Sequence, residues 1–491
     1  MSGAWRAVGR ILRPMSATPL PAPRPLPGAT TGTSPDPATA PPMPVMEPLA
    51  LLVRTSRIDD LPGGLTALVD LLPDTRPLSW VRRGDGIVGW GEALRFDTFG
   101  PGRFADAEAA WQATLQRAVV RDDVRLPGTG PVAFGTFAFD DAGQLDDQDG
   151  DDAGHPRPDG SLVVPRVVVG RRAGVTWMTT ITPGASLDAA PGTAALYREP
   201  RTDVVAPGRV RFADGAVAAA DWPAVVREGV ARIQSGALEK VVLARDVLAT
   251  TEHPLDPRWL LRRLADRYEA CWTFSVSGMV GATPELLVRS EKGLVTSRVL
   301  AGTIRREAGM SDDDALLHAA QLARSSKDLE EHEYAVRSVA AALEPFCSSM
   351  NVPDAPFVLH LPNVMHLASD VTGVLDRGAS ATSRAPSSLT LAAALHPSAA
   401  VCGTPTNVAR DLIREIEGMD RSRYAGPVGW VGADGDGEWG IALRSAELSA
   451  ADPRHVRLFA GCGIVAASDP EAELAESEAK LVPMRWALGA D

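Results

Sequence analysis

The sequence predicts an α+β fold, in which antiparallel β-hairpins are combined with long helices. Runs rich in β-branched and aromatic residues alternate with glycine-containing turns, for example at residues 78–90 and 428–446, and this pattern is typical of hairpins. Other segments repeat their apolar residues with a helical period, most clearly the segment after Ser311. The 491 residues are enough for two or three ordinary domains or for one large core.

The first half of the chain is predicted to begin with a disordered tail and to continue as a series of strands. Proline, alanine, threonine and serine dominate residues 14–44, and this composition cannot bury a core. Gly84-Asp85-Gly86 is a hairpin signal between two β-runs. The aspartate-rich stretch 146–152 and the segment at about 188–214 are expected to be loops. The predicted strands are 50–58, 78–81, 87–90, 132–139, 162–169 and 175–181.

The second half mixes strands with helices. Helices are predicted at 222–235 and 257–268, and strands at 240–249, 273–280, 285–289 and 296–300. The strands 273–280 and 285–289 are expected to pair through the turn between them, and the segment 301–303 is expected to end the strand before it. A further hairpin is predicted from 428–431 and 439–446, around the turn 433–437.

Ser311 is predicted to cap one long helix that extends to about Leu343, with Asp314 as the acid of a capping box. An apolar residue recurs at every seventh position and forms a seam, composed of Leu322, Leu329, Val336 and Leu343. Asp328 and Glu331 are three positions apart on this helix, beside His332. The helical period alone places Glu331 almost opposite the seam, in water.

The C-terminal segment contains the most informative polar residues. Glu473 and Glu476 share one helical face, and Lys480 lies one turn further along it. Carboxylates this close repel each other unless a cation holds them, and Gly461 and Gly463 upstream offer backbone N–H groups to an anion. This combination predicts a magnesium-dependent enzyme with a carboxylate or phosphate substrate. The glycine pattern itself lacks the βαβ context of a dinucleotide site.

Composition excludes several classes of partner. The formal net charge of -13 argues against nucleic acid and anionic membranes, and no apolar run has the length of a membrane span. The four cysteines are scattered without a CxxC spacing, which indicates reduced thiols in a cytoplasmic protein. Two single histidines, His366 and His396, are interpreted as hydrogen-bonded structural residues.

A series of short motifs in the second half resembles the chorismate-utilising enzymes, a family that includes isochorismate, salicylate, anthranilate and aminodeoxychorismate synthases. The closest resemblance covers about 222–488, and a weaker one lies at 135–140 and 165–166. The motifs come in this order: Lys240-Val241-Val242-Leu243-Ala244-Arg245, Gly281-Ala282-Thr283-Pro284-Glu285-Leu286-Leu287, Leu300-Ala301-Gly302-Thr303, Lys327-Asp328-Leu329-Glu330-Glu331-His332, His396-Pro397, Gly403-Thr404-Pro405, Asp420-Arg421, Tyr424-Ala425-Gly426, Ile441-Ala442-Leu443-Arg444 and the C-terminal segment.

The resemblance implies a single catalytic domain of α+β class, a large sandwich of two antiparallel sheets flanked by helices. On this basis we assign 1–45 to the disordered tail, 46–205 to the N-terminal half of the sandwich and 206–491 to the chorismate-binding catalytic region. The resemblance also implies bound Mg²⁺, with Glu331 and Glu476 as direct ligands and Asp328 and Glu473 behind them. This implication replaces the helical-period reading of Glu331 in water.

The substrate implied by the resemblance is chorismate, a dicarboxylate. Its ring carboxylate would lie on the magnesium ion, helped by Lys480. Its second carboxylate would be held by Tyr424, Arg444 and the amide of Gly461, because the guanidinium fork matches a carboxylate. The resemblance places three further residues at the substrate site: Gly302, Thr303 and Ala400.

The residue types favour isochorismate synthase within the family. Adding water to one ring carbon and expelling the hydroxyl two carbons away needs a base and an acid. Lys240 matches the family's base and Glu285 its acid, which must stay protonated. Taken alone, Lys240 would be read as a strand-end surface lysine and Glu285 as a solvated residue. Anthranilate synthases typically lack the lysine, and aminodeoxychorismate synthases have one where this chain has Ala301.

Two alternatives stay open at this point: a salicylate synthase, which goes on to eliminate pyruvate, and a non-catalytic chorismate-binding subunit. The product would feed either menaquinone or siderophore biosynthesis. No sequence feature requires a partner chain, and a cytoplasmic monomer is the expectation.

Overall fold

The computed structural model describes residues 50–141, 157–184, 202–306, 310–376 and 385–489. The predicted tail at 1–45 and the predicted loop at 146–152 lie outside these residues. All elements described below belong to one compact unit, Pro48–Asp491. Among the described helices, none is long and apolar enough to cross a membrane.

Two long strands, β3 (Asp85–Thr98) and β6 (Gly160–Arg172), pair with each other along their full length. From β6 one arm of the sheet continues, each strand antiparallel to the one before. It runs through β5 (Val132–Phe137), β18 (Pro427–Gly432), β19 (Gly437–Ile441), β12 (Leu286–Glu291), β13 (Leu294–Arg305) and β16 (Val364–Leu375). Two short strands pair with the far edge of β16: β14 (Cys347–Asn351) and β15 (Phe357–His360).

The second arm starts from β3 and is also antiparallel. It runs through β2 (Leu78–Arg82), β10 (Trp272–Val276), β11 (Met279–Thr283), β20 (Ser445–Leu448), β21 (His455–Ile464) and β9 (Lys240–Thr251). The far edge of β9 pairs with β8 (Val210–Asp214) and β17 (Gly403–Thr404). Beyond β6 lie β7 (Val175–Pro183), β1 (Leu51–Ile58) and β4 (Val119–Asp122), and only the β1–β4 pair is parallel among the described pairs.

Large aromatic side chains hold the two arms together. Trp80 and Trp272 of the second arm belong to one buried cluster with Phe134 and Trp430 of the first. Two sheet faces that bury apolar residues against each other form a sandwich. The structure therefore confirms the predicted α+β sandwich, and it adds that β3 and β6 join the two sheets into one hydrogen-bonded network.

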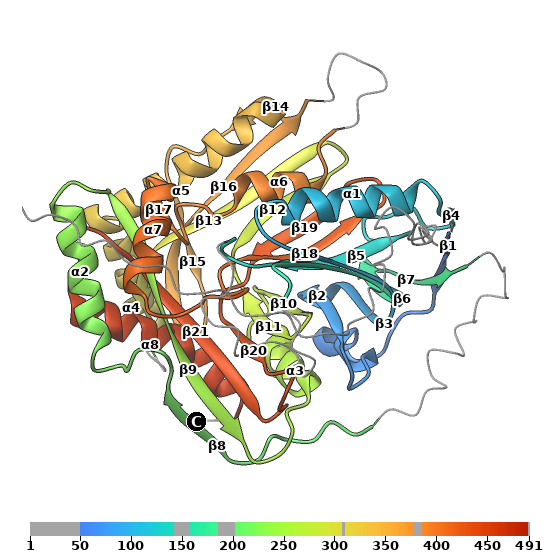
Figure 1. Ribbon diagram of the computed structural model, residues 1–491, viewed down its shortest axis with the longest axis horizontal. Coiled ribbons are helices and arrows are strands. Elements are labelled where there is room, and N and C mark those ends of the chain that lie inside the picture. The colour runs from blue at the N-terminus through green and yellow to red at the C-terminus, as the bar shows by residue number, and fades with distance from the viewer. Residues whose placement is uncertain (1–49, 142–156, 185–201, 307–309, 377–384, 490–491) are drawn as a thin grey trace, which may run out of the picture. The chain divides into compact units, whose positions relative to one another are not determined.

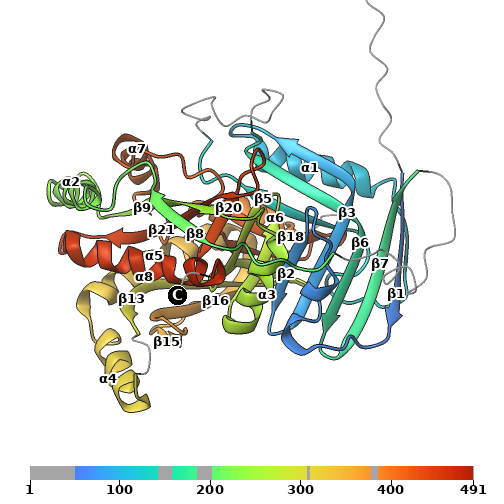
Figure 2. The same cartoon turned by 90° about the horizontal axis from the view of Figure 1, so that it is seen from below.

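Helices cover both arms (Figures 1 and 2). The helices against the first arm and the β3–β6 region are α1 (Arg103–Leu115), α4 (Asp312–Leu322), α5 (Ser326–Leu343) and α6 (Ser388–Leu395). Those against the second arm are α2 (Trp222–Gln234), α3 (Pro257–Arg267), α7 (Thr406–Ile416) and α8 (Pro470–Ala487). Short 3-10 turns lie at η2 (Gly64–Thr66), η3 (Val69–Leu71) and η6 (Glu344–Phe346). In Figure 2, α8 runs alongside β21.

Several predictions of element type or pairing are wrong. The segment 273–280 is not one strand, because Ser277 and Gly278 adopt positive φ and turn the chain into the β10–β11 hairpin. A turn with two positive φ angles matches the twist of the strands that it joins. Consequently β12 pairs with β13 and β19 and not with the preceding strand. The end of the expected loop at 188–214 is also a strand, β8.

The predicted long helix from Ser311 to Leu343 is two helices. Ser311 caps α4 as expected, and its hydroxyl accepts a hydrogen bond from the Asp314 amide. The chain then breaks, and Ser325 caps α5 in the same way by accepting from the Asp328 amide. A second N-cap serine satisfies the amides that a new helix start leaves open. Asp328 and Glu331 therefore lie in the first turns of α5.

Candidate active site

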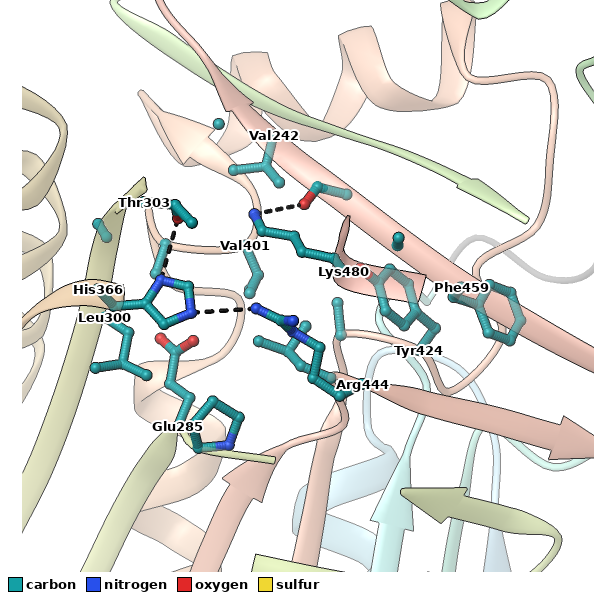
Figure 3. Close-up of a pocket in the computed structure, with 18 of the residues that line it drawn as sticks. Val242, Glu285, Leu300, Thr303, His366, Val401, Tyr424, Arg444, Phe459 and Lys480 are labelled. Atoms are coloured by element: carbon teal, nitrogen blue, oxygen red, sulfur yellow. Dashed lines mark hydrogen bonds between the residues drawn. The ribbon is translucent and has the colours of Figure 1, made fainter. Parts of the chain in front are cut away.

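A cavity of about 690 Å³, including its open part, lies between the two arms (Figure 3). Strands β9 and β21 and helix α8 of the second arm line it together with β13, β16 and α5 of the first. In Figure 3 the side chains of Glu285, Tyr424, Arg444 and Lys480 surround the same space. Most of the site residues predicted from sequence line this cavity: Glu285, Gly302, Thr303, Glu331, Ala400, Tyr424, Arg444, Gly461 and Lys480.

Lys240 lies at the start of β9 and is completely buried. Its Nζ is 3.2 Å from Oε1 of Glu331, and this ion pair joins the second arm to helix α5. The Glu331 side chain is only 13% exposed, so the helical-period expectation that it lies in water is wrong. Gly463 of β21 packs against the Glu331 carboxylate and keeps it from solvent on that side.

Gly463 leaves the room that Lys240 and Glu331 need. A Cβ atom at this position would lie 2.1 Å from Glu331 Oε1 and 3.1 Å from Lys240 Cε. We expect Gly463→Ala to displace the Glu331 carboxylate and to lower kcat by about 10²-fold, since small misplacements of catalytic groups cost this much. The melting temperature should change little, because the displaced atoms are the end of a flexible side chain. Steady-state kinetics and thermal melting measure both effects.

Gly102→Ala is the matched control for this prediction. A Cβ atom at Gly102 would also meet a carboxylate, 3.0 Å from Oδ2 of Asp106, but at the start of α1 and outside the cavity lining. This variant should keep the wild-type kcat. Equal kcat values for the Gly463 and Gly102 variants would show that the position of Glu331 does not matter.

Glu285 immediately precedes β12 and is 5% exposed. Burial raises the pKa of its carboxyl to about 8, although Lys240, the Leu300 amide, Lys480 and Arg444 act in the opposite direction. Desolvation disfavours a charged carboxylate. At neutral pH the group is therefore largely protonated and able to donate a proton. In Figure 3 the Glu285 carboxyl points toward His366.

Three side chains form a hydrogen-bonded row along the cavity (Figure 3). Arg444 Nη2 is 3.1 Å from His366 Nε2, and His366 Nδ1 is 3.1 Å from Thr303 Oγ1. Burial lowers the pKa of His366 well below its ordinary value, helped by Arg444 and Lys480, so the imidazole is neutral. Because a guanidinium only donates, Nε2 accepts from Arg444 and the Nδ1 proton is donated to Thr303. The prediction that His366 is a hydrogen-bonded structural residue is thus confirmed, and the structure adds that it lines the cavity.

Backbone geometry positions Arg444 as well. The predicted strand 439–446 is divided into β19 and β20, and Arg444 lies in the break with a φ of 49°. A non-glycine residue in this region is strained, and such strain concentrates at functional sites. The break directs the buried guanidinium to His366 at the cavity.

Strand β13 does not end at 301–303 as the sequence predicted. It continues to Arg305, and its pairing with β16 shifts register between Ala301 and Thr303. Gly302 has a φ of 78°, and a Cβ there would lie 2.9 Å from the Asp328 Cβ. Oδ1 of Asp328 accepts the Thr303 amide at 3.2 Å. Asp328 therefore fixes the bulge that carries the two predicted substrate residues.

The remaining predicted binding residues lie along β21 and α8. Tyr424 stacks on Phe459 with ring centroids 4.9 Å apart, and burial raises the pKa of its phenol to about 12, which keeps it neutral.

The backbone of Gly461 is free of β9. The amide of Ala244, which faces Gly461 across the ladder, donates to Glu417 and not to β21. The Ala244–Gly461 pair is therefore the non-hydrogen-bonded type. Both backbone groups of Gly461 thus point away from β9, and its carbonyl accepts from Lys480 Nζ at 2.9 Å.

Lys480 also pairs with Glu476, with 2.7 Å between Nζ and Oε1. Burial acts to lower the pKa of Lys480, but the Glu476 carboxylate outweighs it and the net shift is upward. Glu473 is buried one turn before, and its ligand oxygen lies within 4.8 Å of Glu476 Oε and the Sγ of Cys462. The thiol was not among the predicted site residues. Burial raises its pKa well above the ordinary value, so it stays neutral.

The carboxylates suit a hard divalent cation. Glu331 approaches Gly463, and Glu476 approaches Gly461 through Lys480, so α5 and α8 bring acidic groups to the same short segment of β21. Mg²⁺ prefers carboxylate oxygens and water. Lys240 and Lys480 balance these two carboxylates in the structure. The donor set therefore fits the predicted magnesium ion. Of the four predicted acids only Glu331 lines the cavity, and Glu476 reaches it through Lys480.

The fold and the site define a class of protein: an α+β sandwich with a cavity between its two arms, where a buried lysine, a buried carboxyl of raised pKa and several further acidic and basic side chains gather. The chain belongs to the chorismate binding enzyme family, whose sequence profile matches residues 78–489.

Named relatives and solved structures agree with this assignment. The chain is 41% identical over 282 residues to isochorismate synthase DhbC of Bacillus subtilis, covering 55% of this chain and 68% of the relative. It is 35% identical over 429 residues to the salicylate biosynthesis isochorismate synthase of Pseudomonas aeruginosa, covering 84% and 85%. The crystal structure of MenF, the menaquinone-specific isochorismate synthase of Escherichia coli, has a TM-score of 0.70 at 23% identity, over 90% of this chain and 95% of MenF. That last likeness concerns the fold.

Proposed function

We propose that this chain is an isochorismate synthase, which converts chorismate to isochorismate with Mg²⁺. The observation that carries the proposal is that Lys240 and Glu285 belong to the same site: Glu285 lines the cavity, and Lys240 lies directly behind the lining, against Glu331 and Gly463. Lys240 is fully buried beside Glu331, and Glu285 is buried with a raised pKa. One can act as base and the other as acid. The similarity to the isochorismate synthases of Bacillus subtilis and Pseudomonas aeruginosa supports the same reaction.

Arg444 and Tyr424 are proposed to bind the enolpyruvyl carboxylate together with the Gly461 amide. Arg444 is held by His366, so its planar fork is oriented before substrate arrives. Lys480 is proposed to meet the ring carboxylate. Gly302, Thr303 and Ala400 complete the wall of the cavity.

Glu331 and Glu476 are proposed to hold Mg²⁺ directly, with Asp328 and Glu473 behind them. When bound, the metal would withdraw negative charge from the ring carboxylate of the substrate. The Lys240 amine takes a proton from water as the water oxygen bonds to one ring carbon, and after turnover this proton returns through solvent to the Glu285 carboxylate. The ring double bonds shift, and the hydroxyl two carbons away departs as water with the proton of Glu285. One water enters and one leaves, so the reaction is an isomerisation.

All residues assigned to the site lie between Lys240 and Lys480, within the region 206–491. This supports the proposed division of the chain into an N-terminal half at 46–205 and a catalytic region. Because one chain supplies every proposed group, we propose a monomer that acts in the cytoplasm without nucleic acid or a membrane. The pathway served would be menaquinone or siderophore biosynthesis.

The test is to incubate purified protein with chorismate and Mg²⁺ and to separate the products chromatographically. Isochorismate is the expected product. Salicylate with pyruvate would instead identify a salicylate synthase, and unchanged chorismate would identify a non-catalytic binding subunit.

The pH dependence of kcat/KM tests the role of Glu285. An acid acts in its protonated form, and the pKa of this carboxyl is raised to about 8 by burial. We therefore expect kcat/KM to fall as pH rises through about 8, because Glu285 loses the proton it must donate. Glu285→Gln should lower kcat by about 10²-fold or more and remove this alkaline fall. An unchanged alkaline limb in the variant would assign the fall to another group.

A further inference from the structure

Glu417 and Arg421 form a buried ion pair next to the cavity. Glu417 follows α7, and Arg421 lies one helical turn further along the chain. The Arg421 side chain is 3% exposed and that of Glu417 is 0% exposed. Arg421 Nε donates to Glu417 Oε2 at 2.8 Å, and the guanidinium stacks on Phe139 at 4.3 Å.

The pair is connected to the backbone on both sides of the cavity wall. Arg421 Nη2 donates to the carbonyl of Val242 at 2.7 Å, and Nη1 donates to the carbonyl of Val401 at 2.9 Å. Glu417 Oε1 accepts the amide of Ala244 at 2.7 Å. Val242 and Ala244 are two residues apart on β9, so these groups lie on the same edge of the strand.

This edge of β9 is the one that pairs with the segment leading into β17. The Glu239 amide donates to Thr404 O, and the Val242 amide donates to Cys402 O, both at 2.8 Å. Beyond Val242 the two segments separate. Arg421 and Glu417 then supply the donor and acceptor that a neighbouring strand would have supplied.

We propose that Glu417 and Arg421 are positioning residues, which fix the register between the start of β9 and the segment that carries Ala400 and Val401. Lys240 begins β9, two residues before Val242, and Ala400 lines the cavity beside Val401. The Glu417–Arg421 pair, called the clamp below, therefore holds the proposed base and the neighbouring segment that carries Ala400 and Val401 at a constant separation. A buried ion pair contributes little to stability compared with apolar residues of the same volume, which agrees with a positioning role.

The inference rests on the proposed function for its kinetic test, which uses Arg421→Lys and Glu417→Gln. Lysine at 421 keeps the positive charge but cannot donate to Glu417, Val242 and Val401 at once. Glutamine at 417 keeps an oxygen that accepts the Ala244 amide, but it has no negative charge to pair with the Arg421 guanidinium. Each variant should lower kcat, Arg421→Lys by about 10²-fold and Glu417→Gln by about 10-fold, with KM within about threefold of wild type. The double variant should be no slower than Arg421→Lys, because both act through one unit.

Arg258→Lys is the matched control. Arg258 is buried and paired with Asp256 at the start of α3, outside the cavity lining. This variant should lose thermal stability as Arg421→Lys does, but it should keep the wild-type kcat.

Hydrogen–deuterium exchange tests the clamp without reference to activity. In Arg421→Lys the peptides that cover 240–246 and 398–404 should exchange faster than in wild type, and the rest of β9 should not. Wild-type kcat in both clamp variants would overturn the positioning role, as would unchanged exchange in these peptides. A rise in KM alone for Arg421→Lys would make it a direct substrate contact instead. If the wild-type protein makes no isochorismate, the proposed function fails while the exchange experiment still decides the clamp.

Discussion

Lys240→Met is expected to lower kcat for isochorismate formation by about 10³-fold or more, since general base catalysis contributes about 10² to 10⁴. KM should stay within about threefold of wild type, because the amine acts on water and not on the bound carboxylates. Methionine is unbranched and fills the fully buried site without leaving a cavity. Steady-state kinetics with chorismate and saturating Mg²⁺ measure the effect, and binding of chorismate by calorimetry confirms that the substrate still enters.

Lys480→Met separates the roles of the two buried lysines. Lys480 contacts Glu476 and the Gly461 carbonyl, and its proposed partner is the ring carboxylate. This variant should mainly raise KM. If Lys240→Met keeps wild-type turnover, or if both variants change only KM, Lys240 is not the base.

Glu476→Ala is expected to reduce activity and the apparent affinity for Mg²⁺ together. Removing an outer partner of a metal ligand costs about 10- to 100-fold in affinity or activity, and removal of a direct carboxylate ligand should cost at least about 10²-fold. The variant also removes the carboxylate that lies 2.7 Å from Lys480 Nζ. The site then carries one negative charge fewer, which further weakens its attraction for a cation. Activity titrated against Mg²⁺ and direct calorimetric titration of the metal give the two readouts.

Glu478→Ala controls for the loss of a carboxylate from the same helix. Glu478 pairs with Arg245 and Arg485 and does not line the cavity. Its variant should have the wild-type Mg²⁺ requirement. If Glu476→Ala shows the wild-type rate at the Mg²⁺ concentration that half-saturates the wild type, Glu476 is not a ligand.

The fold class and most elements follow from local sequence signals. The strand at 240–249 and the helices at 222–235 and 257–268 form within a residue or two of their predicted bounds. The failures have local causes that can be named. Ser277-Gly278 is a turn signal inside an apolar run, and Ser325 is a helix cap inside an apparently continuous period. In both places the apolar pattern was given more weight than the residues that start or stop an element.

The site was predicted through motif resemblance and not through periodicity. The helical period placed Glu331 in solvent, because a period describes one helix and cannot include contacts with residues from other elements. The structure brings Glu331 against Lys240 and Gly463. His366 was predicted to be a hydrogen-bonded structural residue, and this is confirmed, but its place in the cavity was missed because its partner Arg444 lies far away in sequence. Cys462 was not predicted as a site residue, because its position near Glu473 and Glu476 depends on how α8 packs against β21.

The central claim is that this site adds water to chorismate, with Lys240 as base and Glu285 as acid. Reaction of purified protein with chorismate and Mg²⁺ in ¹⁸O-enriched water, followed by mass spectrometry of the separated product, tests it most directly. The account predicts isochorismate with one ¹⁸O in its ring hydroxyl, and no label in the Lys240→Met reaction over the same time. Isochorismate without ¹⁸O, or an equally labelled product from the variant, would contradict it.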